Sequence, residues 1–170
     1  MESLKQKLIK LYNSQESLPE QRRRFQKFAK ENASIELLKA ADVLSKSKRK
    51  EEQKIAAHIL IPELYFLDPK ISQKIIFRLA NSDDWGVREE AATILKGLNK
   101  KHFKEMVLIY KKWIKDGNNF IQRAISVGLS GVKDSYALAC EVIEPILRNS
   151  DRYVRVNLGP FSLAWLYYRE

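Results

Sequence analysis

Three short segments of the sequence resemble one another: DWGVR at residues 84–88, NFIQR at residues 119–123 and DRYVR at residues 151–155. Each opens with Asp or Asn, whose side chains cap the first turn of a helix, and ends with an arginine. The three arginines are 35 and 32 residues apart. Patterns that recur at such spacings are typical of stacked helical repeats, in which each helix pair buries its apolar stripe against the next pair. The sequence therefore predicts an α-solenoid.

The remainder of the chain also predicts helices, because apolar residues recur at helical spacing along it. We expect these helices near residues 3–13, 20–30, 34–44, 53–66, 71–80, 100–115 and 134–148, with a bend at Pro62. The segment SKSKRK at residues 45–50 has no apolar residue and is expected to form a solvated loop. Only 6 Gly and 5 Pro interrupt the chain, which favours long helices over short strands. The predicted class is all-α.

The predicted domain organisation follows from length and from where the repeats begin. A chain of 170 residues is long enough for one domain with a substantial core. The Asp…Val-Arg opening is typical of HEAT-like repeats, so we expect a right-handed α-α superhelix; ordinary bundle helices with a coincidental likeness are the alternative. Repeat signals are weak before residue 83. Residues 1–52 are therefore expected to form an atypical N-terminal capping repeat, and residues 53–170 the repeats that carry the candidate groove.

The charge of the chain indicates a polyanionic partner. Lys and Arg number 31 against 21 Asp and Glu, which gives a formal net charge of +10 and a pI near 9.6. Such a surface attracts nucleic acid or an anionic membrane, whereas simple solubility is the unspecific interpretation. No window approaches 18 continuous apolar residues, and the N-terminus lacks a cleavable leader, so neither membrane spanning nor secretion is expected.

Several kinds of chemistry find no support in the residues. Cys140 is the only cysteine, which excludes an intramolecular disulfide and favours the reducing cytoplasm. His58 and His102 lie far along the chain from each other and from Cys140, so no metal site is expected. The sequence contains no glycine-rich phosphate loop and no dinucleotide fingerprint, and no cofactor is expected.

One face of the helix that begins near Asp84 carries the candidate site. At about 100° per residue, one stripe is apolar and must face the core, namely Val87, Ala91, Ile94 and Leu98. Trp85, Glu89 and Lys96 lie on the opposite stripe. A tryptophan opposite the core with a carboxylate one turn later indicates a binding surface. The alternative is that Trp85 packs under a neighbouring repeat while Glu89 forms a surface ion pair.

The next repeat helix places Arg123 in the same relation to its core. Here the apolar stripe is Ile121, Ile125 and Leu129, and the expected outer stripe is Arg123, Ser126 and Ser130. The short serine side chains would let a phosphate approach the planar donors of the guanidinium. An intramolecular bridge to Glu89 or Glu90 is an equally good interpretation. Because neighbouring repeats present equivalent faces, we expect Trp85, Glu89 and Arg123 to share one groove.

Longer stretches of the sequence resemble a known family. DDWGVREEAATILKGLNKKHFKEM, WIKDGNNFIQRAISVGL and EPILRNSDRYVRVNLGPF are similar to the HEAT-like DNA alkylation repair family, the AlkD-type alkylpurine DNA glycosylases. The resemblance covers roughly residues 50–165. Two positions depart from the family pattern: Glu89 stands where Asp is usual, and Pro160 or Phe161 stands where a further Trp is expected. The chain ends at Glu170, which is what a shortened member would show.

The resemblance implies the roles of the candidate residues. Trp85 and Glu89 would stabilise the positive charge that develops on the sugar as a cationic alkylated purine leaves, or Glu89 would activate the attacking water. Arg123 would hold a phosphate of double-stranded DNA beside the lesion. Further phosphate contacts are expected without sequence preference from Arg88, Lys96, Lys100, Lys101, Arg152 and Arg155.

We expect the protein to be a monomer, and the sequence leaves its activity open. The first interpretation is a DNA glycosylase that hydrolyses the N-glycosidic bond. The alternative is a non-catalytic HEAT-repeat module that binds DNA or a protein partner through the same face.

Overall fold

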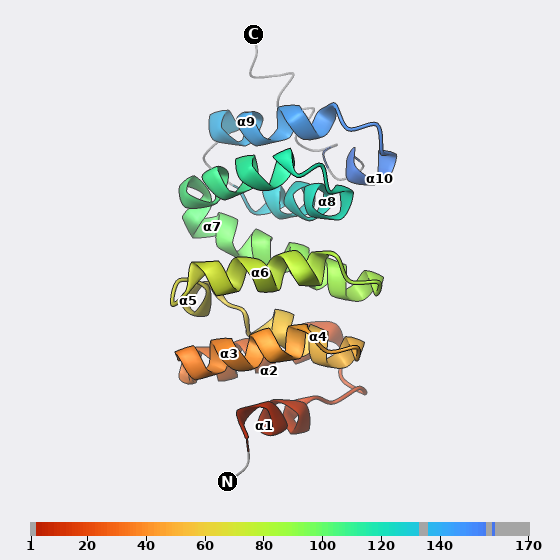
Figure 1. Cartoon of the computed structure of the whole chain (residues 1–170). Coiled ribbons are helices and arrows are strands. Elements are labelled where there is room, and N and C mark those ends of the chain that lie inside the picture. The colour runs from red at the N-terminus through yellow and green to blue at the C-terminus, as the bar shows by residue number, and fades with distance from the viewer. Residues whose placement is uncertain (1–2, 133–135, 156–157, 159–170) are drawn as a thin grey trace. The chain divides into compact units, whose positions relative to one another are not determined.

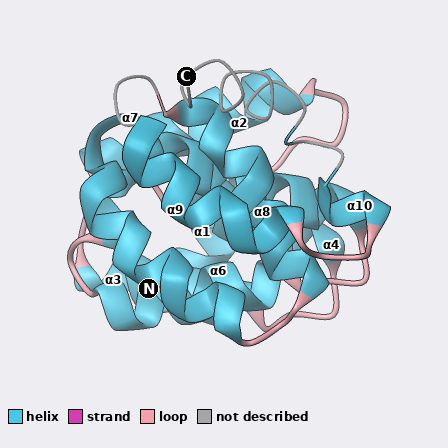
Figure 2. Ribbon diagram, turned by 90° about the horizontal axis from the view of Figure 1, so that it is seen from above, coloured by secondary structure: helices cyan, strands magenta, loops and turns pink. Residues whose placement is uncertain are grey.

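The computed structural model in Figure 1 describes residues 3–132, 136–155 and 158. In this part of the chain every regular element is a helix, and Figure 2 shows helices joined by loops without a strand. The predicted all-α class is confirmed. The right-handed superhelical course of the repeats stays a prediction.

The chain forms two compact units, Met1–Ile94 and Leu95–Glu170. The first unit holds α1 (Leu4–Leu11), α2 (Leu18–Glu31), α3 (Ile35–Ser45), α4 (Lys50–Ile59), α5 (Pro62–Tyr65), α6 (Pro69–Ala80) and the start of α7 (Trp85–Lys115). The second holds the rest of α7, then α8 (Asn119–Gly128), the 3-10 turn η1 (Leu129–Gly131), α9 (Tyr136–Leu147) and α10 (Arg152–Arg155). The capping repeat at residues 1–52 and the repeat region at 53–170 stay predictions.

Helix α4 is central to the packing of the first unit. It lies against both α2 and α3, and α3 also contacts α1 and α6 (Figure 1). These contacts bury large apolar side chains almost completely, among them Phe25, Leu38, Ile55, Leu64 and Ile75. Since burial of each such side chain stabilises the fold by about 1.5–3 kcal/mol, this core holds the helices in place.

Local capping explains where the helices of the first unit begin. Ser17 and Glu20 form a reciprocal capping box at the start of α2, and Pro19 occupies its first turn. Asp68 accepts a hydrogen bond from the backbone amide of Ile71 at 3.0 Å and starts α6 in the same way. The expected loop at residues 45–50 is present between α3 and α4, shortened by one residue at each end.

The helix expected at residues 53–66 is interrupted, which corrects the prediction of a single bent helix. Helix α4 ends at Ile59, and the separate short helix α5 begins at Pro62. Leu60 between them has φ −79° and ψ 71°, outside the helical region. A proline has no amide to donate and its ring crowds the preceding turn, so the chain leaves the helix instead of bending.

Helix α7 consists of two helical segments that meet at His102, whose φ of −128° and ψ of 28° are not helical. The first segment carries Trp85 and Glu89, and the second belongs to the helix that the sequence places at residues 100–115. The expected division between repeat helices is therefore present as a kink, without an intervening loop.

Helix α8 organises the second unit by packing against α9 and α10. Ile121 and Ile125 of α8 and Leu129 at the start of η1 are fully buried, which confirms the predicted core stripe. A buried hydrogen bond of 2.7 Å from the Tyr110 hydroxyl to the side-chain oxygen of Asn99 joins the two segments of α7.

The caps of three helices give the register of the repeats. Oδ1 of Asp84 accepts from the amide of Val87 at 3.0 Å, and Oδ1 of Asn118 accepts from that of Ile121 at 3.1 Å. Asp151 likewise accepts from the amide of Tyr153 at 2.8 Å. These caps are 34 and 33 residues apart, so the cap of the middle helix is Asn118 and not Asn119. Counted from the caps, Arg123 occupies the position of Glu89, and Gln122 that of Arg88.

Replacing Gly128 by Ala is expected to destabilise the second unit by about 1–3 kcal/mol. A Cβ at this position would lie 2.8 Å from Cβ of Leu95, which is attached to helix backbone and cannot swing away. Urea unfolding measures the change. Gly97→Ala is the matched control, because its Cβ would meet nothing within 4 Å and the substitution favours the helix. Equal stability of the two variants would contradict the close approach.

Candidate functional site

The first turns of α7 present the stripe that the sequence predicts. Val87, Ala91, Ile94 and Leu98 are buried, as expected for the core side. Trp85 is 59 % exposed, Glu89 is half-buried and Lys96 is exposed. Trp85 and Glu89 are one helical turn apart on the same side of the helix. The structure therefore brings an accessible indole and a carboxylate together at the surface.

The loop before α7 is held by Arg88. Its Nη1 donates to the backbone carbonyls of Ser82 at 2.6 Å and Asp83 at 3.0 Å. The carbonyls at the end of a loop are thereby satisfied by a side chain four residues into the helix. These hydrogen bonds to the loop compete with the phosphate contact that the sequence predicts for Arg88. The phosphate contact stays a prediction.

Lys54 of α4 lies beside the first turn of α7. A Cβ built on Gly86 would be 3.1 Å from both the Lys54 ammonium nitrogen and Oδ1 of Asp84. The absence of a side chain at Gly86 leaves space for this half-buried lysine. A positive charge is thus held beside the first turn of α7.

A buried ionic cluster lies beneath the Trp85 and Glu89 stripe. Arg22 of α2 donates to both carboxylate oxygens of Glu90, at 2.8 Å to Oε1 and at 3.0 and 3.1 Å to Oε2. Nε2 of His58 on α4 lies 3.1 Å from Oε2 of the same carboxylate. His58 and Glu90 are only 2 % and 4 % exposed. Three helices are therefore joined at the residue that follows Glu89.

The cluster keeps Glu90 ionised in the core. Burial alone would raise the pKa of Glu90, but the contacts from His58 and Arg22 outweigh it and hold the pKa below its ordinary value. Sequence reasoning did not find this cluster. The available signal is His58 itself, a polar residue inside the apolar run at residues 55–61.

Arg123 does not face solvent, which corrects the predicted outer stripe of α8. Its side chain is 6 % exposed and its guanidinium lies over the ring of Tyr153, 4.6 Å from the centroid. Ser126 is also buried and its hydroxyl donates to the backbone carbonyls of Arg123 at 2.8 Å and Val154 at 3.2 Å. Helix α10 covers this side of α8, whereas Ser130 is exposed as expected.

The remaining candidate phosphate ligands are exposed at the surface. In the second unit they are Lys96, Lys100, Lys101, Arg152 and Arg155. Arg155 donates from Nη2 to the carbonyl of Ser150 at 3.3 Å, much as Arg88 binds its own loop. That Arg123 and these residues share one groove with Trp85 and Glu89 stays a prediction.

The described residues show neither a metal-binding cluster nor a membrane-spanning helix. No group of three His, Cys, Asp or Glu side chains there is arranged to hold a metal ion. None of the described helices has the length and apolar character needed to cross a membrane.

The observations define a class of protein: basic, all-helical, with recurring capped helices and an exposed tryptophan next to a carboxylate. The family model of the DNA alkylation repair enzymes matches residues 17–160, so the chain belongs to the DNA alkylation repair enzyme family. No curated protein and no solved structure matches the chain. Its role lies in DNA alkylation repair.

Proposed function

We propose that the chain is a DNA glycosylase that removes cationic alkylated purines from double-stranded DNA. The observation that supports this most directly is the exposure of Trp85 beside Glu89 on α7 in a member of the repair family. An exposed indole is costly to keep in water without a partner, and a carboxylate beside it suits a cationic substrate.

Cleavage of this glycosidic bond needs little catalytic assistance from the protein. A purine alkylated at N3 or N7 is already positively charged, so the bond from C1′ of the sugar to the base breaks with its electron pair moving onto the purine. The sugar then carries positive charge, which the carboxylate of Glu89 and the π-face of Trp85 stabilise. Water adds its oxygen to C1′ and loses a proton. The carboxylate of Glu89 is the proposed acceptor of this proton.

The activity is tested by treating duplex DNA with a methylating agent and measuring released methylpurine. Release that depends on the protein supports the glycosylase. Binding of untreated and treated duplex without release identifies a non-catalytic DNA-binding module instead. Absence of any salt-sensitive binding to DNA contradicts both and indicates a protein scaffold.

The resemblance gives Arg123 a phosphate beside the lesion, and because its guanidinium is buried against Tyr153, this role requires the guanidinium to become accessible when DNA binds. Arg123→Ala is expected to weaken DNA binding and to lower the slope of log affinity against log salt by about 1. The slope is measured by fluorescence anisotropy between 50 and 200 mM salt. Tyr153→Leu is the control, because it removes the stacked ring and keeps the charge. An unchanged slope in Arg123→Ala contradicts the phosphate contact.

Three other expectations belong to the same proposal and stay predictions. They are a monomeric state, a cytoplasmic location and a superhelical course of the repeats.

A further inference from the structure

Helix α2 carries the basic run Arg22-Arg23-Arg24, whose side chains differ in their contacts and exposure. Arg22 is bound to the buried carboxylate of Glu90, and Arg24 forms an ion pair with Glu16. Arg23 and Lys30 are exposed, and within the described part of the chain neither makes a hydrogen bond or an ion pair. Two cations of α2 are therefore bound to carboxylates of the protein, whereas others remain exposed at the surface.

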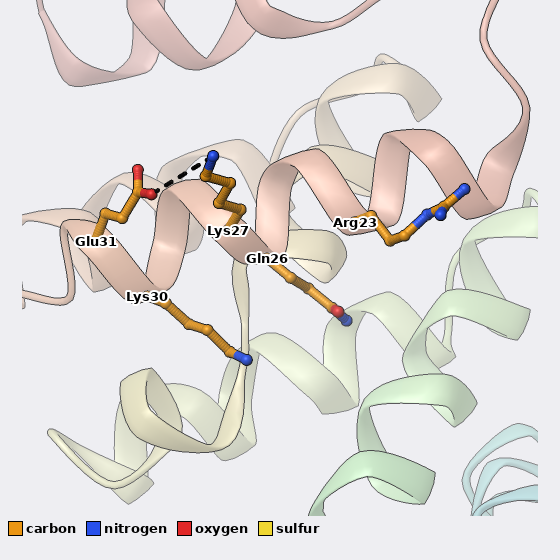
Figure 3. Close-up of a pocket in the computed structure, with 5 residues that line it drawn as sticks. All are labelled: Arg23, Gln26, Lys27, Lys30 and Glu31. Atoms are coloured by element: carbon orange, nitrogen blue, oxygen red, sulfur yellow. Dashed lines mark ion pairs between the residues drawn. The ribbon is translucent and has the colours of Figure 1, made fainter.

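The exposed cations lie on one side of α2 around a shallow hollow. Its lining consists of Arg23, Gln26, Lys27, Lys30 and Glu31. Figure 3 shows Gln26 and Lys30 extending to the same side of the helix, while Lys27 turns toward Glu31. Lys27 and Glu31 are 4.0 Å apart and both are highly exposed, so their ion pair is weak and easily replaced.

Helix α2 is joined to the helix that carries the candidate site within the first unit. Arg22 reaches Glu90, the residue after Glu89, and Gln26 follows Arg22 by one helical turn. A duplex held at Trp85 and Glu89 extends to either side of the lesion, so the exposed cations of α2 are candidates for its flanking phosphates.

We propose that Arg23, Lys27 and Lys30 bind backbone phosphates of the DNA flanking the lesion, a contact that rests on the proposed function. Arg23 and Lys30 are seven residues apart, which corresponds to about 10 Å along the helix and is comparable with three steps of 3.4 Å axial rise between successive phosphates of one strand. The lining of the hollow has no apolar residue, which suits phosphate and disfavours an anionic membrane bound through an amphipathic face. Gln26 adds an uncharged donor in the same row.

The test uses two triple variants with the same loss of net charge. The first is Arg23→Gln, Lys27→Gln and Lys30→Gln. The control is Lys39→Gln, Lys70→Gln and Lys74→Gln, which removes three exposed lysines of α3 and α6. Circular dichroism and urea unfolding check that both variants keep the fold, as expected for exposed substitutions. Affinity for a methylated duplex is then measured over a series of salt concentrations.

The α2 variant is expected to lower the salt slope by about 2–3, since each phosphate contact contributes about 0.9, and the control to lower it by less than 1. Equal slopes in the two variants overturn the inference while wild-type binding leaves the proposed function standing. A wild-type protein without salt-dependent DNA binding overturns both.

A second measurement locates the contact on the DNA. Duplexes are shortened to a few base pairs on one side of the lesion and then on the other. The α2 variant and the wild type are expected to bind alike on one of the two shortened duplexes and to differ on the other. A difference that persists on both duplexes contradicts a contact confined to the flank.

Discussion

Replacing Glu89 by Gln is expected to abolish release of methylpurine while leaving affinity for DNA nearly unchanged. The amide has the shape of the carboxylate but carries no charge, so it cannot stabilise the developing cation or accept the proton of water. Loss of one preorganised electrostatic group lowers a catalytic rate by about 100–1000-fold. The half-buried position of Glu89 beside the exposed Trp85 makes it available for this role. Single-turnover release from methylated duplex measures the effect.

Two variants make the Glu89 result specific. Glu89→Asp keeps the charge and restores the acid usual in the resembling glycosylases, so it is expected to retain release. Glu36→Gln removes a carboxylate from the exposed start of α3 and is expected to have no effect. Full activity of Glu89→Gln contradicts the catalytic assignment and leaves family membership untouched.

Replacing Glu90 by Ala is expected to cost about 3–5 kcal/mol of stability, because it leaves Arg22 and His58 without their shared partner in the core. Both nitrogens of Arg22 that donate to Glu90 lose their acceptor, and Nε2 of His58 loses the carboxylate that lies 3.1 Å away. Urea unfolding at neutral pH measures the loss. Glu36→Ala is the matched control, since an exposed glutamate is worth much less. A cost below about 1 kcal/mol for Glu90→Ala contradicts the role of the cluster.

The same cluster predicts the direction of the pH dependence. The folded pKa of Glu90 lies below its ordinary value of 4.5, so the carboxylate binds its proton less readily in the native state than in the unfolded one. Its contribution to stability is therefore complete above pH 4.5 and declines as the pH falls toward the lowered value. The neutral variant Glu90→Gln is expected to lose this part of the acid sensitivity. An acid transition identical to that of the wild type contradicts the assignment.

The helices were predictable because their signals are local. Apolar spacing in α7 and α8 identifies the buried stripes without knowledge of any partner, and side chains such as Asp84 mark helix starts. The same local signals do not locate the exact residue at which a helix begins or ends. Asn118 and Asn119 are both good caps, and only the hydrogen bond to Ile121 identifies the first as the cap. Pro62 indicates a disturbance, but not whether the helix bends or ends.

The sequence by itself determined the all-helical class, the recurrence of capped helices, the family, and the exposed stripe of Trp85 and Glu89, since all of these follow from periodicity and neighbouring residues. Only the tertiary structure decided which charges are used internally. Arg22 and Arg23 are neighbours in one basic run, yet the first binds buried Glu90 and the second stays exposed. Arg123 is likewise covered by Tyr153, from a helix about thirty residues later. A helical wheel assumes one buried side, whereas packing against a second neighbour buries another, and that neighbour is supplied by the fold.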